Sequence, residues 1–136
     1  MIVRRLAATL ALCAAAVQAA PQPGTDFDLG RMYRHGAGVA QDSARAFALI
    51  DRAARDGHPA ALFIAAAMLA AGEGAPKDVA RSRRYLEAAA ELEYPEALQQ
   101  LAMNLREGAP GYARDEERAA QLLRELAHAM KHRAHH

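Results

Sequence analysis

Residues 59–71 read PAALFIAAAMLAA and contain no charged or polar side chain. Alanine, leucine and methionine favour helix, Pro59 suits a first helical position, and Gly72 follows where a left-handed cap belongs. A helix that is apolar on every side must be buried on nearly every side or cross a membrane. These residues are too few for the roughly 20 that a bilayer requires. The stretch therefore predicts the central helix of a small helical protein, with neighbours on both sides.

The chain repeats itself around this stretch with a period of 36 residues. Gly36, Gly72 and Gly108 recur at that spacing, as do Asp42 and Asp78. A fixed period in this range indicates a solenoid, in which each unit is two helices that cannot bury their apolar faces alone. We therefore predict an all-α fold, an α/α solenoid (superhelix) of three helix-turn-helix repeats of about 36 residues.

The recurring residues have plain structural reasons. Glycines after the first helix of each pair suit the left-handed backbone of a tight turn, and Asp42, Asp78 and Asp115 suit the N-caps of the second helices. Small residues at Gly30 and its equivalents, Ala66 and Ala102, would let facing helices approach closely. The charged run that includes Arg81, Arg83 and Glu87 is expected to be a solvated convex face, with Arg83 and Glu87 paired along one helix.

The same residues resemble a known repeat. The pattern Leu-Gly-x-x-Tyr-x-x-Gly-x-Gly-Val-x-x-Asp-x-x-Arg-Ala over residues 29–46, followed by Ala-Ala-x-x-Gly at 53–57, resembles the Sel-like repeat, a relative of tetratricopeptide repeats. The resemblance covers residues 26–131, with repeats at about 26–57, 58–93 and 94–131. It implies an adaptor between proteins, and bacterial members of the family are often secreted or periplasmic.

Residues 1–19 are predicted to be a cleavable secretory signal peptide, followed by a linker at 20–25. Arg4 and Arg5 form a basic start, residues 6–17 are apolar, and Val17-Gln18-Ala19 fits a small-x-small cleavage site. The alternative of a short anchor helix is weaker, because the apolar run is short. Lipidation of Cys13, the only cysteine, would require a small preceding residue, and Leu12 is not small. We expect a periplasmic or secreted protein.

Composition argues against several functions. With 17 basic and 16 acidic residues, the chain has no basic excess for nucleic acid. The only serines, Ser43 and Ser82, fall in predicted first turns of second helices, and no His-Glu-x-x-His motif occurs. We therefore predict no catalytic residue, no cofactor and no membrane span in the mature protein. A cell-wall-associated hydrolase remains an alternative without a motif of its own.

The C-terminus is rich in histidine, with a tail at 132–136. His128, His132 and His135 follow the spacing i, i+4, i+7, which would place three imidazoles on one helix face where they can ligate zinc or copper. A solvated helix end explains the same residues, together with His136, more simply. These three histidines are weak metal candidates, and a metal-binding protein is an alternative function.

In tetratricopeptide-like solenoids the first helix of each pair lines the concave face. The repeat register then assigns nine positions to a partner-binding groove: Phe27, Arg31, Arg34, Phe63, Ala67, Ala70, Gln99, Met103 and Arg106. The middle of this set is apolar and the ends carry arginine, which suits a protein or peptide segment with an apolar anchor and flanking carboxylates. The alternative is that Phe63 belongs to the core and the arginines are solvated.

The first helix has no predicted neighbour before it. Phe27, Leu29 and Met32 would then be uncovered, which predicts weak self-association or a covering partner at that end.

Overall fold

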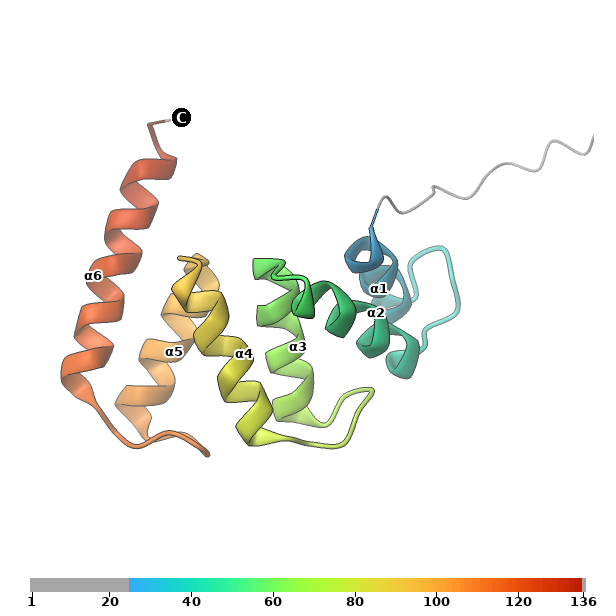
Figure 1. Ribbon diagram of the computed structural model, residues 1–136, viewed down its shortest axis with the longest axis horizontal. Helices are drawn as coiled ribbons and strands as arrows, with labels where there is room; N and C mark the ends of the chain where they lie inside the picture. Colours follow the sequence, from blue (N-terminus) through green and yellow to red (C-terminus); the bar gives the residue numbers. More distant parts are fainter. Residues whose placement is uncertain (1–24, 136) are drawn as a thin grey trace, which may run out of the picture.

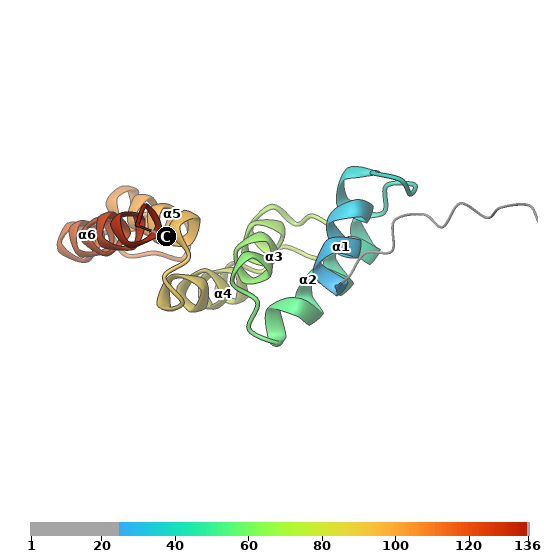
Figure 2. The ribbon, with the colours of Figure 1, turned by 90° about the horizontal axis from the view of Figure 1, so that it is seen from above.

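The computed structural model describes residues 25–135, which form six helices and no strand. The helices are α1 (Asp26–His35), α2 (Ser43–Arg55), α3 (Pro59–Ala71), α4 (Val79–Glu91), α5 (Pro95–Glu107) and α6 (Glu116–Arg133). Each packs mainly on its neighbours in sequence, and the three pairs stand in a row (Figures 1 and 2). The predicted all-α solenoid of three repeats is confirmed. The predicted signal peptide, the linker up to residue 24, Cys13 and His136 lie outside the described residues.

The helix ends follow the repeated residues. Asp42, Asp78 and Asp115 have extended backbones, and the side chain of each accepts a hydrogen bond from the N–H three residues later, at 2.9–3.0 Å. Gly36, Gly72 and Gly108 end the first helices in the left-handed conformation, with φ between 65° and 71°. The capping roles predicted for these residues are therefore confirmed.

Small residues bring the helices together. A Cβ on Gly30 would lie 2.6 Å from Ile50 Cγ1, so α1 and α2 could not keep their present separation with a larger residue there. Ala66 and Ala102, the equivalent positions in the next repeats, are 3% and 0% exposed. The core is built from alanine with a few larger side chains between, of which Ile50, Met68, Leu69, Leu98 and Leu101 are the most deeply buried.

The central helix α3 is less covered than its sequence predicts. Ala61, Leu62, Ala65, Ala66, Met68 and Leu69 are buried, but Ala67, Ala70 and Ala71 are exposed. The expectation that α3 is buried on nearly every side is wrong for the stripe of Ala67, Ala70 and Ala71. The first helices of the neighbouring pairs do not close over this stripe. An apolar helix is thus left with an open apolar face.

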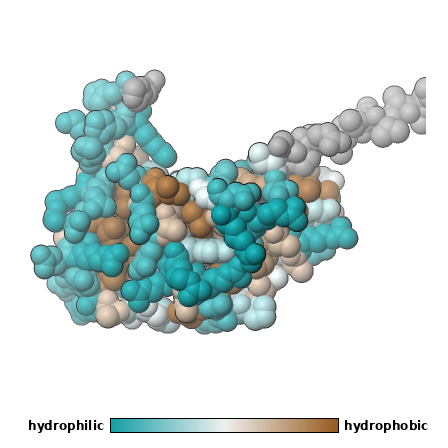
Figure 3. All heavy atoms as spheres, in the orientation of Figure 1, coloured by the Kyte–Doolittle hydropathy of each residue, from teal (hydrophilic) through white to brown (hydrophobic). Residues whose placement is uncertain are grey.

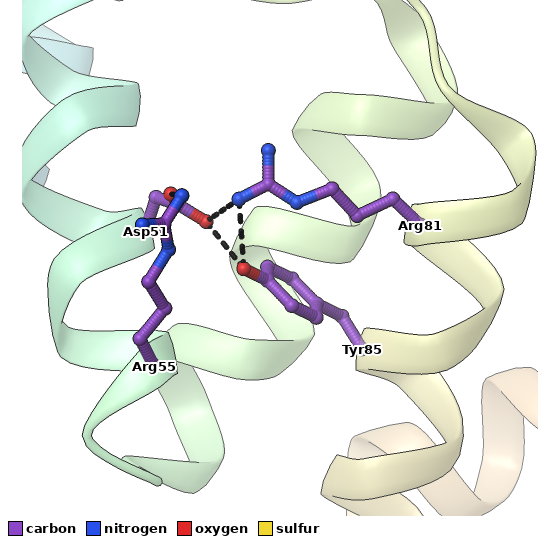
Figure 4. Close-up of polar contacts among 4 residues, drawn as sticks. All are labelled: Asp51, Arg55, Arg81 and Tyr85. Carbon is purple, nitrogen blue, oxygen red and sulfur yellow. Dashed lines mark hydrogen bonds and ion pairs between the residues drawn. The ribbon is translucent and has the colours of Figure 1, made fainter.

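A cluster of charged residues joins the first repeat to the second (Figure 4). Asp51 of α2 has a side chain only 9% exposed, and its Oδ1 lies 2.6 Å from Arg81 Nη2 of α4 and accepts a hydrogen bond from the Tyr85 hydroxyl at 2.6 Å. Arg55 approaches the other carboxylate oxygen at 2.9 Å. The expectation that Arg81 is solvated is therefore wrong, because a buried carboxylate thirty positions earlier holds its guanidinium. Arg83 and Glu87 do pair along α4, at 3.1 Å.

The N-terminal end is better covered than the sequence predicts. Phe27 is 8% exposed and its ring lies 4.4 Å from that of His58, while Leu29 and Met32 are half-buried. The exposed large apolar side chains of the described residues lie elsewhere, at Leu92, Met103, Leu123 and Met130. Self-association through α1 stays a prediction, without the exposed surface that motivated it.

Gly74 lies in the loop after α3, where this loop packs against the start of α2. A Cβ there would lie 2.0 Å from the Ser43 carbonyl oxygen, in a residue whose φ is +73°. Gly57 has a similar φ of +84° but no atom within 4 Å of its Cβ position. We expect Gly57→Ala to cost about 1–2 kcal/mol from backbone strain, and Gly74→Ala to cost about 1–3 kcal/mol more from overpacking.

Urea denaturation of both variants measures this difference. Equal losses would show that the loop does not need to approach α2 this closely.

The Asp51 cluster gives the second prediction. Asp51→Ala leaves Arg81, which is 23% exposed, without its carboxylate, so we expect a loss of about 2–3 kcal/mol in the free energy of unfolding. Arg114→Ala is the control, because Arg114 pairs with Glu116 in solvent and such pairs contribute about 0–1 kcal/mol.

A double-mutant cycle with Arg81→Ala isolates the pairwise energy by chemical denaturation. Additive losses from the two single variants would mean that the contact contributes nothing of its own.

Candidate functional site

The exposed alanines of α3 line a hollow between the second and third repeats. Its volume is about 440 Å³, within the usual range for binding pockets. Its walls come from α3, α4, α5 and the two loops that follow α3 and α5. The lining residues are Phe63, Ala66, Ala67, Ala70, Ala71, Lys77, Val79, Ser82, Leu86, Gln100, Asn104, Ala109, Pro110 and Tyr112. We call this space the alanine hollow.

The wall of the alanine hollow on α3 is apolar and made of small side chains. Ala67, Ala70 and Ala71 are exposed in it, and Phe63 is half-buried, with its ring centroid 5.7 Å from that of Tyr94. Phe63 therefore packs on the core and also borders the hollow, and its part in binding a partner stays a prediction. The small side chains leave space into which an aliphatic or aromatic group can fit.

The polar groups of the hollow fall into two kinds. Ser82 is already engaged, because its hydroxyl donates to the Ala66 carbonyl at 2.7 Å, and Gln100 Nε2 donates to Asn104 Oδ1 at 3.0 Å. By contrast, Lys77 forms no ion pair within residues 25–135. The free ammonium of this exposed lysine gives the rim of the hollow a positive charge.

Tyr112 supplies a buried hydroxyl that has no hydrogen-bond partner among the described residues. Burial raises the pKa of this phenol, while the nearby Asn104 amide lowers it by less. Arg83 covers the ring at 5.5 Å from its centroid. The hydroxyl oxygen is closed off from solvent, so Tyr112 contributes its ring and not its hydroxyl to the surface of the hollow.

The structure divides the nine predicted groove positions among three places. Phe63, Ala67 and Ala70 line the alanine hollow. Gln99, Met103 and Arg106 line a second hollow of about 760 Å³ between α5 and α6, together with Glu107, Arg114, Glu116, Ala120 and Leu123. Phe27, Arg31 and Arg34 border neither of these two hollows.

The arginines at the N-terminal end are already engaged. Arg34 makes a two-pronged contact with Glu73, at 2.9 and 3.0 Å, and this contact holds the pKa of Glu73 below its ordinary value. Arg31 lies over the buried Phe27 ring, 5.7 Å from its centroid. Arg34 therefore ties α1 to the loop after α3, and its guanidinium is not free to receive a partner carboxylate.

Sequence reasoning missed the polar groups of the alanine hollow, among them Lys77, Asn104 and Tyr112. The repeat register transfers positions along first helices, whereas Lys77 and Tyr112 lie in loops. The irregular third loop, with its extra residue and Pro110-Gly111, was the available signal for Tyr112. An aromatic residue in an insertion next to an apolar helix is a candidate for lining a pocket.

The histidine-rich end is only partly as predicted. His128 and His132 lie one turn apart on α6 with their Nε2 atoms 3.1 Å from each other. His135 lies beyond Arg133, the last residue of α6, so it does not continue the face of the other two. Across residues 25–135, no group of three or more histidine, cysteine, aspartate or glutamate side chains could hold a metal ion.

No helix within residues 25–135 has both the length and the apolar character that crossing a membrane requires.

Comparison with known proteins agrees with this fold. The family model for the Sel1 repeat matches residues 26–58, 59–94 and 95–129. The crystal structure of a Sel1 repeat protein from Oxalobacter formigenes superposes with a TM-score of 0.74 at 31% identity, over 79% of this chain and 43% of that one. A second structure is c5321, a protective antigen present in uropathogenic Escherichia coli strains displaying an SLR fold. It gives a TM-score of 0.69 at 26% identity, over 76% of this chain and 22% of that one.

This chain therefore spans less than half the length of either solved relative. Among curated protein sequences none matches it.

Proposed function

Because the chain belongs to the Sel1 repeat family, whose members are typically protein–protein interaction modules, we propose that it is a secreted or periplasmic adaptor without catalytic activity. We place its partner site at the alanine hollow. The observation that carries this proposal is the open apolar stripe of Ala67, Ala70 and Ala71 on α3, bordered by α4, α5 and two loops.

The chemistry of the hollow favours binding over catalysis. Its lining contains no histidine, cysteine, aspartate or glutamate, and its one serine hydroxyl is used in a hydrogen bond to Ala66. Nucleophilic catalysis would need a base within hydrogen-bond reach of that hydroxyl. The hydrolase alternative therefore has no support from this site.

The lining also indicates what the partner presents. An apolar side chain would fit against the alanines and Phe63, where it would remove apolar surface from water at about 25 cal/mol per Å². A carboxylate beside that side chain would face the ammonium of Lys77. We thus expect a peptide segment with an apolar residue next to an acidic one.

The test of the site uses two exposed alanines with opposite expected effects. Ala67→Glu places a charge in the hollow, and Ala48→Glu places the same charge on the exposed side of α2. Each affinity-tagged variant is expressed in its native cells and its partners are captured and quantified by mass spectrometry. We expect Ala67→Glu to lose the partner that wild type and Ala48→Glu retain, with unchanged circular dichroism and melting temperature.

Retention of every partner by a folded Ala67→Glu variant would place the binding site elsewhere. Equal loss in both variants would show a general effect of charge.

Export is proposed from the sequence of residues 1–19 alone. The basic start, apolar segment and small-x-small site should direct secretion and cleavage before Ala20. Mass spectrometry of the protein from fractionated cells should find a mature chain that begins at Ala20 or Pro21 in the envelope or medium. Intact Met1 in the cytosolic fraction would contradict the proposal.

A further inference from the structure

Two histidines face each other near the free end of α6. His128 and His132 are exposed, their ring centroids are 4.4 Å apart, and the rings are inclined by 61°. Their Nε2 nitrogens are 3.1 Å apart, within hydrogen-bond distance. The end of α6 projects beyond the other helices, and hydrophilic residues cover its visible face (Figures 1 and 3).

The separation of the two nitrogens matches that of two ligands on one metal ion. At metal–nitrogen distances near 2.0–2.1 Å, adjacent ligands lie about 2.8–3.0 Å apart in a square plane and about 3.3–3.4 Å apart in a tetrahedron. The observed 3.1 Å falls between these values. A metal ion could therefore be bound by both nitrogens with only a small change in their separation.

We propose that His128 and His132 form an open, exchangeable site for a divalent transition metal, which binds Cu²⁺ more tightly than Ni²⁺ or Zn²⁺. Imidazole nitrogens suit all three ions, and affinity at such ligands rises from Ni²⁺ to Cu²⁺ and falls to Zn²⁺. With two protein ligands, the remaining coordination positions hold water. The pair lies on α6, none of whose residues lines the alanine hollow.

The charges around the pair act in opposite directions on a bound cation. Arg124, Lys131 and Arg133 lie within one or two turns and oppose a cation, whereas Glu125, three residues before His128, favours one. The free carbonyl groups at the C-terminus of α6 carry partial negative charge and favour one. Within residues 25–135, no carboxylate joins the two histidines in a group of three possible metal ligands. Hard ions such as Mg²⁺ and Ca²⁺, which prefer oxygen ligands, therefore have no suitable protein ligands at this site. The site therefore depends on imidazole chemistry, not on net charge.

The experiment titrates the full mature chain with CuCl₂. Calorimetry measures the binding, and electron paramagnetic resonance identifies the ligands of the bound ion. We expect one saturable site with nitrogen ligands, and weaker binding of NiCl₂ and ZnCl₂. His128→Gln and His132→Gln should each weaken Cu²⁺ binding at least about tenfold, since each removes one of the two ligands. These residues are exposed, so circular dichroism should be unchanged.

Two further variants separate the pair from the general richness in histidine. Exchanging two residues, Met130→His with His132→Met, keeps the composition but places the imidazoles at i, i+2, where they do not face each other. We expect this variant to lose the site. His135→Gln with His136→Gln should retain it.

Wild-type affinity in the exchanged variant would overturn the proposal, as would loss of binding in the tail variant. Binding of MgCl₂ or CaCl₂ with similar affinity would also overturn it.

Discussion

The fold depends on one constraint: α3 is apolar all round, so it can exist in water only with helices packed on more than one side. α4 covers one side as its partner within the repeat, and α2 covers another from the preceding repeat. The Asp51–Arg81 contact reaches across from α2 to α4 and joins the two elements that enclose α3 (Figure 4). Met68 and Leu69 of α3 are buried in this arrangement, at 0% and 1% exposed.

The same constraint creates the site. α3 packs against α2 and α4, but α5 does not close over Ala67, Ala70 and Ala71. Helix caps and loops border the space that remains. Glycines and aspartates fix the geometry of these caps and loops. A rigid scaffold that presents small apolar side chains loses little conformational entropy on binding, which favours recognition of a partner segment.

Much of the fold follows from the sequence because it depends on local chemistry. The cap at Asp42, the turn at Gly72 and the start of α3 at Pro59 each require only their own neighbours, and the period copies them along the chain. Long-range contacts were not predictable in this way. Asp51 on α2 contacts Arg81 on α4. Neither the charge pattern nor the period of the sequence indicates that this carboxylate is buried.

The residues of the candidate site were likewise predictable only in part. Phe63, Ala67 and Ala70 follow from the register of the first helices and do share a hollow. Arg34 does not take part, because Glu73 in a loop engages it. Lys77 and Tyr112 enter from loops, whose paths the repeat pattern leaves open.

The central claim is that the alanine hollow receives a partner segment with an apolar residue beside an acidic one. Site-specific photocrosslinking tests it most directly, with a photoreactive amino acid at Ala70 in the hollow and, separately, at Ala48 on the exposed side of α2. The account predicts that only the Ala70 position crosslinks to the partner, at a segment of that composition. Crosslinks from Ala48 to the same partner, with none from Ala70, would contradict it.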